Sequence, residues 1–195
     1  MYYIVGLGNP GTEYELTRHN AGRIVLEHFL RSHAFPDVVP SKKYASLVAH
    51  GVVIDEDVTV LFPETFMNKS GSAVGKIVTS AKKAAQTIVV YDDVDLPLGT
   101  VKVAFGRGSG GHKGIESIMR ALKTRDFIRV RVGITPMTPM GKLRKPKGEE
   151  KMLDFLLGSF KKPELHELHR VGVRVNDILR TIIEKGYAAA MNEYN

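Results

Sequence analysis

The sequence predicts an α/β fold, a single globular domain in which a central mixed β-sheet is flanked by helices. Three observations lead to this class. The chain has 195 residues, which suits one domain with a substantial core. Short apolar runs alternate with segments whose apolar residues recur at helical spacing. We find neither internal repeats nor a second domain, so strands and helices are expected to pack in layers around one core.

Each short run of branched apolar residues is expected to form a strand, and each helically spaced segment a helix. The expected strands are residues 2–7, 45–49, 58–62, 87–91, 101–105 and 128–134. The expected helices are residues 20–33, 67–84, 113–123 and, near the C-terminus, 163–186. A glycine-rich loop is predicted at 106–111, and a mobile basic loop at 135–148, where three prolines and a Lys/Arg cluster occur.

Composition limits the functions that are open to the chain. The net charge is +7, and a basic surface attracts polyanions such as nucleic acid, although many proteins are mildly basic without such a partner. The absence of cysteine excludes disulfides, thiolate zinc sites and cysteine nucleophiles. No apolar run is long enough for a membrane span, and the start of the chain does not resemble a secretory leader. A cytoplasmic location is therefore expected.

Two glycine patterns, at residues 6–11 and 106–111, match the dinucleotide-binding fingerprint as strings of letters. The first has the preceding strand that the fingerprint requires. However, Pro10 removes a backbone donor that a pyrophosphate would need, and Glu13 and Glu15 would repel a phosphate at close range. A nucleotide-dependent oxidoreductase is therefore disfavoured, and no cofactor is expected.

His166 and His169 lie three residues apart in the C-terminal helical pattern. The zinc-binding helix pattern places its two histidines four residues apart, and no third ligand is evident near this pair. A solvated helix face is therefore the favoured interpretation, and no metal site is predicted.

His19 stands at a predicted helix start, away from any apolar stripe. A helix cap or a surface position would account for it, but other polar residues also occur at predicted strand ends. Asn9 follows the first strand, Asn68 lies near another helix start, and Asp92 ends the strand at 87–91. A histidine can take a proton near neutral pH, a carboxylate fixes its tautomer, and amides can orient a water or hold an oxyanion. Because no nucleophile is evident, the pattern indicates direct attack by water.

The chain resembles the bacterial peptidyl-tRNA hydrolases over nearly its whole length. The matching blocks are residues 5–11 (Val-Gly-Leu-Gly-Asn-Pro-Gly), 17–22 (Thr-Arg-His-Asn-Ala-Gly), 66–71 (Phe-Met-Asn-Lys-Ser-Gly), 91–97 (Tyr-Asp-Asp-Val-Asp-Leu-Pro), 110–114 (Gly-Gly-His-Lys-Gly) and 131–134 (Arg-Val-Gly-Ile). Several separated blocks in the right order are far more specific than a lone glycine pattern. The resemblance implies a monomer with a mixed central sheet, and metal-free hydrolysis of the ester that joins peptide to tRNA.

The same resemblance assigns roles to individual residues. His19 would be the general base, Asp92 would hydrogen-bond its imidazole, and Asn9 would join them in catalysis. Asn9 would also bind substrate, together with Asn68 and Met67. The remaining substrate-binding positions are Tyr14 and Lys113, and the residues implied to hold the tRNA 5′-phosphate are Lys102, Arg107 and Arg131.

Two features depart from the family pattern. Lys113 stands where the family usually has asparagine, so it is expected either to lower the pKa of a nearby His19 or to turn outward to RNA phosphate. A basic stretch at 142–147 either contacts the tRNA acceptor stem or forms a solvated loop.

These departures keep open a second class of function, that of an RNA-binding relative without turnover, which the chloroplast splicing-factor branch of the family exemplifies. Retention of His19, Asp92, Asn9 and Asn68 together favours the enzyme, because a binding module needs no base with an orienting carboxylate.

Overall fold

Seven strands form one sheet in the order β2-β3-β4-β1-β5-β7-β6 in a computed structural model that describes residues 1–195. The strands are β1 Tyr2–Gly6, β2 Val39–Ser41, β3 Ser46–Val53, β4 Glu56–Pro63, β5 Thr87–Pro97, β6 Val101–Phe105 and β7 Ile128–Thr135. The central neighbours β4-β1, β1-β5 and β5-β7 are parallel, whereas β2-β3, β3-β4 and β6-β7 are antiparallel. The predicted mixed sheet is therefore confirmed.

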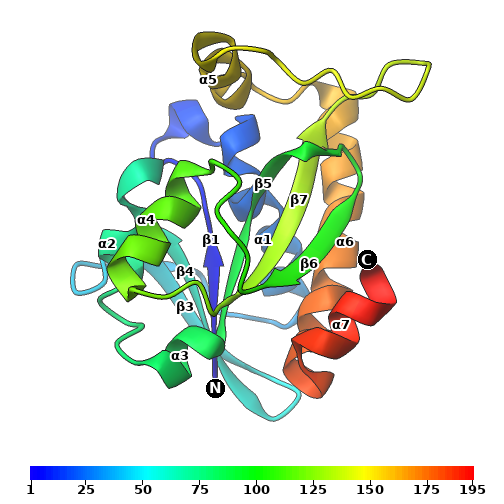
Figure 1. Cartoon of the computed structure of the whole chain (residues 1–195). Helices are drawn as coiled ribbons and strands as arrows, with labels where there is room; N and C mark the ends of the chain where they lie inside the picture. The colour runs from blue at the N-terminus through cyan, green and yellow to red at the C-terminus, as the bar shows by residue number, and fades with distance from the viewer.

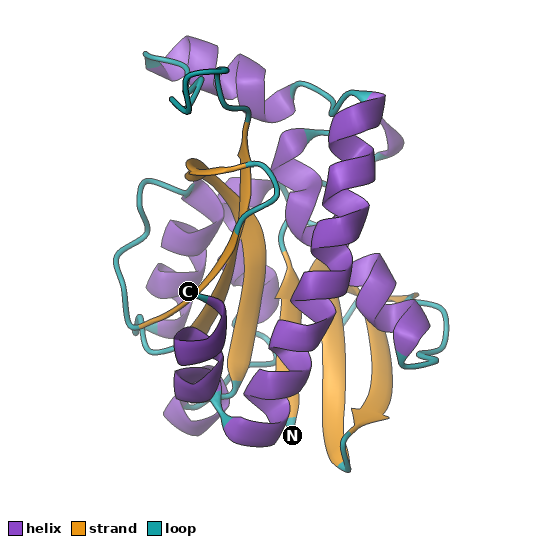
Figure 2. Ribbon diagram, turned by 90° about the vertical axis from the view of Figure 1, so that its right-hand side faces the viewer, coloured by secondary structure: helices purple, strands orange, loops and turns teal.

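Helices cover both faces of this sheet, as Figures 1 and 2 show. The α-helices are α1 Ala21–Ser32, α2 Ser70–Val74, α3 Ala81–Ala85, α4 Lys113–Leu122, α5 Glu149–Leu157, α6 Lys162–Lys185 and α7 Tyr187–Tyr194. Short 3-10 turns occupy Thr12–Tyr14, Arg18–Asn20 and Met67–Lys69. No helix is long and apolar enough to cross a membrane.

The alternation of side chains along the central strands produces two cores. Along β5, Ile88 and Val90 face a core of 27 buried residues that also contains the apolar faces of α1 and α6. The intervening Val89 and Tyr91 face a second core of 15 buried residues, which α2 and α4 cover. The chain therefore folds as the predicted α/β layers, with the ends of the parallel strands free to carry polar groups.

Some predicted element boundaries are wrong. Residues 67–84 do not form one helix, because α2 ends at Val74 and α3 begins only after Ser80, whose side chain accepts a hydrogen bond from the Lys83 backbone as an N-cap. Strand β5 continues beyond residue 91 to Pro97, and β7 includes Thr135, which the sequence places in the basic loop.

The structure also contains strand β2 and helices α5 and α7, which were not predicted from the sequence. Helix α5 has no fully buried residue, although its apolar residues Phe155 and Leu156 pack partly buried against the larger core. It follows the segment 136–148, which folds back on itself through a single bridge between Met137 and Leu143 and reaches β5 through an ion pair of Lys145 with Asp95. The mobility of this segment stays a prediction.

Candidate active site

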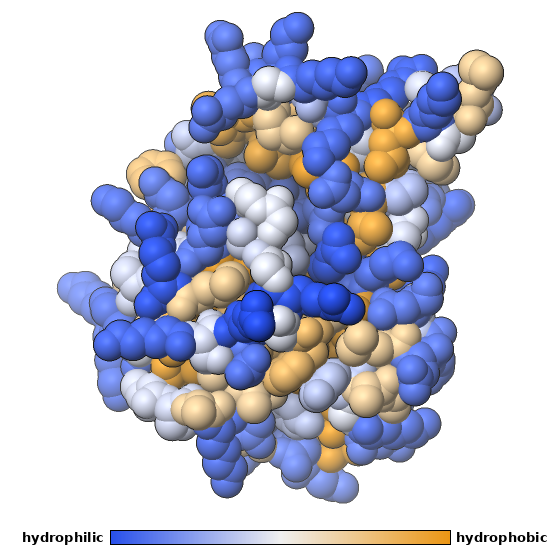
Figure 3. Space-filling view, in the orientation of Figure 1, coloured by the Kyte–Doolittle hydropathy of each residue, from blue (hydrophilic) through white to orange (hydrophobic).

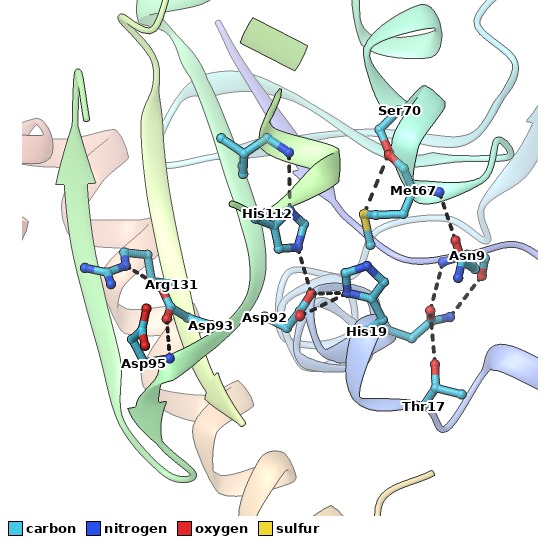
Figure 4. Close-up of polar contacts among 12 residues, drawn as sticks. Asn9, Thr17, His19, Met67, Ser70, Asp92, Asp93, Asp95, His112 and Arg131 are labelled. Carbon is cyan, nitrogen blue, oxygen red and sulfur yellow. Dashed lines mark hydrogen bonds and ion pairs between the residues drawn. The ribbon is translucent and has the colours of Figure 1, made fainter. Parts of the chain in front are cut away.

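Polar residues gather where the central parallel strands end. Asn9 follows β1, Met67 follows β4, and Asp92 lies in β5, while His19 comes from the 3-10 turn just before α1. Because parallel strands present their carboxyl ends at the same edge of a sheet, these segments meet there. Figure 4 shows Asn9 and Met67 on one side of His19 and Asp92 on the other.

His19 and Asp92 form a buried pair. Nδ1 of His19 lies 2.9 Å from Oδ1 and 3.0 Å from Oδ2 of Asp92, and the two residues are 7% and 2% exposed. Burial favours the neutral ring, but the charge of Asp92 and its hydrogen bond outweigh burial and raise the pKa of His19. Burial also opposes ionisation of Asp92, yet the two neighbouring imidazoles hold its pKa well below the usual range.

The ionised carboxylate decides the tautomer of His19. A carboxylate only accepts hydrogen bonds, so Nδ1 carries the proton and donates it, and Nε2 of the neutral ring keeps its lone pair. His19 also lines the large cavity described below. The sequence-based expectation that Lys113 lowers the pKa of His19 is wrong, because Asp92 is the charge that governs this ring.

A second histidine, which the sequence analysis did not assign to the site, shares the same carboxylate. Nε2 of His112 lies 3.0 Å from Oδ1 of Asp92, and its Nδ1 accepts a hydrogen bond from the Ile115 backbone at 3.3 Å as the N-cap of α4. His112 therefore donates to Asp92 and accepts from the helix. The matching block at 110–114 contained the signal, but only the fold brings His112 to Asp92.

The side-chain amide of Asn20, which was not predicted as a site residue, holds Asn9 in place. The Asn9 backbone N–H donates to Oδ1 of Asn20 at 2.8 Å, and Nδ2 of Asn20 donates to the Asn9 carbonyl at 3.0 Å. Oδ1 of Asn9 accepts from the Met67 backbone at 2.9 Å. Because these bonds occupy its backbone and Oδ1, Nδ2 of Asn9 is the group left to donate to a substrate.

Arg18 attaches the turn that carries His19 to the start of α6. Its guanidinium donates to both carboxylate oxygens of Glu164, at 2.8 and 2.9 Å, and to the carbonyls of Gly158 and Ser159. Arg18 is buried, and the rings of Phe155 and Phe160 lie beside its guanidinium. Because the planar guanidinium makes several charge-assisted hydrogen bonds, it fixes the turn that carries His19.

The other expected substrate-binding residues lie near Asn9. Asn68 is exposed next to the buried Met67 and makes no hydrogen bond within the protein. The ring of Tyr14 packs edge-on against Phe66, with centroids 6.4 Å apart. Lys113 is exposed and lines the cavity.

A cavity of about 790 Å³ extends from His19 and Asp92 toward β6 and α5. Figure 3 shows this face of the molecule, where hydrophilic side chains predominate and apolar patches lie under the α5 segment at the top. The basic residues that line the cavity are Lys102, Arg107, Lys113, Arg129, Arg131 and Lys145. The fold thus brings together the three residues expected to hold a tRNA phosphate.

Two arginines on the same side of β7 serve this cavity differently. Nε of Arg131 donates to Oδ2 of Asp93 at 2.7 Å, and although burial opposes the charge, this contact raises the pKa of Arg131. Arg129 is 1% exposed and donates to the carbonyls of Arg107 and Gly108, so it supports the glycine-rich loop from below. Its supporting role was not predicted from the sequence.

The fold and the site define an α/β protein with a buried histidine–carboxylate pair beside a basic cavity. A family model described as peptidyl-tRNA hydrolase matches residues 3–195. The chain belongs to the peptidyl-tRNA hydrolase family, which confirms the resemblance and the enzyme class expected from the sequence.

Individual relatives agree with this assignment over nearly their whole lengths. The chain is 38% identical to a peptidyl-tRNA hydrolase of Syntrophomonas wolfei, with full coverage of both chains. It is 36% identical to one of Syntrophotalea carbinolica, covering 100% of this chain and 97% of the relative. A crystal structure of peptidyl-tRNA hydrolase from Acinetobacter baumannii superposes with a TM-score of 0.88 at 28% identity, covering 100% of this chain and 94% of that one.

Proposed function

We propose that this chain hydrolyses the ester between the peptide and the 3′-terminal ribose of peptidyl-tRNA, using water activated by His19 and no metal ion. The observation that carries the proposal is the contact of His19 Nδ1 with the buried Asp92 carboxylate, which leaves Nε2 as a proton acceptor. Family membership supports the substrate.

In this mechanism a water molecule gives a proton to Nε2 of His19 as its oxygen attacks the ester carbonyl carbon. The imidazolium that forms is stabilised by Asp92, in agreement with the raised pKa of His19. The tetrahedral intermediate collapses, His19 returns the proton to the ribose oxygen, and free peptide and tRNA result. Nδ2 of Asn9 donates to the substrate at the reacting ester.

Peptide and RNA are proposed to occupy different sides of His19. The ester and the peptide are contacted by four residues on one side, Asn9, Met67, Asn68 and Tyr14. The tRNA phosphate is held in the cavity by three basic residues, Lys102, Arg107 and Arg131. Because Arg131 also contacts Asp93, its positive charge is divided between that carboxylate and the RNA. The same proposal includes a monomer in the cytoplasm, which sedimentation and cell fractionation would test.

The direct test is release of free peptide from purified peptidyl-tRNA in the presence of EDTA. The proposal predicts rapid release that EDTA does not diminish. Tight tRNA binding without release would instead support the RNA-binding class of function, and loss of release with EDTA would contradict the metal-free step.

Binding of tRNA is expected to weaken steeply with salt. Each phosphate that the protein neutralises contributes a slope of about −0.7 to −0.9 to log K against log salt, so the phosphate held in the cavity gives about this slope and each further phosphate contact adds as much. The dissociation constant should be measured between low and physiological salt, with Lys102→Ala as the matched variant whose slope is smaller by about 1. A salt-independent affinity would contradict binding through phosphate.

Lys113→Asn is expected to preserve or raise the turnover of peptidyl-tRNA. Lys113 is exposed and makes no hydrogen bond or ion pair within the protein. It begins α4, where a positive charge opposes the helix dipole at a cost of about 0.3–1 kcal/mol. Steady-state kinetics and a thermal melt of both proteins test this. A loss of activity of tenfold or more would show that Lys113 has acquired a function of its own.

A further inference from the structure

Three side chains that bind metals well converge at the carboxyl end of β5. They are His19, Asp92 and His112, the only group of three or more such residues in the structure whose ligand atoms lie within 4.8 Å of one another. Both ring nitrogens contact the same oxygen, Oδ1 of Asp92, at 2.9 and 3.0 Å. Each residue comes from a separate segment held by the fold, as Figure 4 shows.

We propose that these three side chains form a binding site for a transition-metal ion of the Zn²⁺ type, and that metal bound there inhibits the enzyme. Two imidazoles and one carboxylate are a donor set found in zinc sites, whereas Mg²⁺ and Ca²⁺ prefer oxygen ligands. Ligand atoms about 2.0–2.1 Å from a tetrahedral metal lie about 3.3 Å apart. The present separations from Oδ1 are 2.9 and 3.0 Å, so the two nitrogen–oxygen separations need change little, and the two nitrogens lie within 4.8 Å of each other.

The site is also accessible to an ion. His19, Asp92 and His112 all line the large cavity, so an incoming metal reaches them from solvent and a water can occupy its fourth position. His112 gives up one long contact when it binds, because its Nε2 then holds the metal, its proton moves to Nδ1, and the 3.3 Å bond from Ile115 is lost.

Inhibition follows from the chemistry of a neutral imidazole, which has one N–H and one lone pair. In the metal-free site the proton is on Nδ1 of His19 and Nε2 is the acceptor. A metal at Nδ1 takes that lone pair, so the proton moves to Nε2. His19 then has no nitrogen that can accept a proton from water. This consequence rests on the proposed function, whereas metal binding does not.

Binding is tested first, by calorimetric titration of EDTA-stripped, dialysed full-length protein with Zn²⁺ and by the visible spectrum with Co²⁺. We expect one ion per chain. His112→Asn removes one ligand but keeps a side chain that caps helices well, and should weaken Zn²⁺ binding at least tenfold. The control is the double variant His166→Asn/His169→Asn, which removes the exposed histidine pair on α6 and should bind Zn²⁺ as the wild type does.

Activity is tested second, by release of peptide with increasing Zn²⁺ and, separately, the same concentrations of Mg²⁺. Zn²⁺ should abolish turnover of the wild type and of the control variant, EDTA should restore it, and Mg²⁺ should not inhibit.

Two binding results would overturn the site: no Zn²⁺ binding, or binding that depends on His166 and His169 instead of His112. Either would leave the proposed hydrolysis as it stands. Binding at the site with full or increased turnover would overturn the inhibition and contradict the role of His19 Nε2 as the base.

Discussion

Replacement of His19 by alanine is expected to lower kcat for peptidyl-tRNA by about 10²–10⁴, the usual contribution of a positioned general base. The affinity for tRNA should stay nearly unchanged, because the basic residues expected to bind phosphate line the cavity separately from the imidazole. Single-turnover release of peptide and a direct tRNA-binding measurement separate these two effects.

The matched control is His166→Ala, which removes an exposed imidazole on α6. It should leave both kcat and tRNA affinity unaltered. A circular dichroism spectrum should be recorded to check that the His19→Ala protein is folded. Weaker tRNA binding with unchanged turnover would contradict the assignment of His19 as the base.

The fold was predictable because burial is periodic along its principal elements. In β5, alternate residues enter different cores, and in α6 the residues Leu168, Val171 and Val175 follow the helical repeat. The break between α2 and α3 depends instead on the capping contact of Ser80, and α5 buries no residue fully. Elements as short as these contain too few residues for a periodic pattern to be decisive in the sequence.

The grouping of the candidate residues was predictable from their positions at the ends of elements, since Asn9 and Asp92 stand at strand ends and His19 at a helix start. Its supporting contacts were not, because they join residues far apart in the sequence. Arg18 reaches Glu164 across 146 positions, and His112 shares the carboxylate of Asp92 with His19. Such partners become evident only when the fold brings the start of α6 to the turn at Arg18–Asn20 and the start of α4 to β5.

Asp92→Asn is expected to lower kcat by about 10³–10⁴ by placing His19 in the wrong tautomer, an effect of the size seen in Ser-His-Asp enzymes. His112 must accept from Ile115 through Nδ1, so its Nε2 must donate to residue 92. The single amide oxygen of asparagine therefore takes the place of Oδ1, which both rings reach, and its NH₂ group takes the place of Oδ2, 3.0 Å from Nδ1 of His19. Because that NH₂ group can only donate, it favours the His19 tautomer with a lone pair on Nδ1 and the proton on Nε2, in which the base is lost.

The pH dependence of the residual activity distinguishes this account from simple damage to the site. The proposed mechanism needs neutral His19, so wild-type activity is expected to fall as the pH drops through the raised pKa of His19. Without the charge of Asp92, burial alone acts on the ring and lowers that pKa, so the acid limb of the kcat/KM profile should move to lower pH.

Asp93→Asn is the matched control, because this neighbouring carboxylate pairs with Arg131 and not with a histidine. It should change KM through the tRNA contact and leave the acid limb in place. An acid limb that stays put in Asp92→Asn, or one that moves equally in both variants, would show that Asp92 does not set the proton affinity of His19.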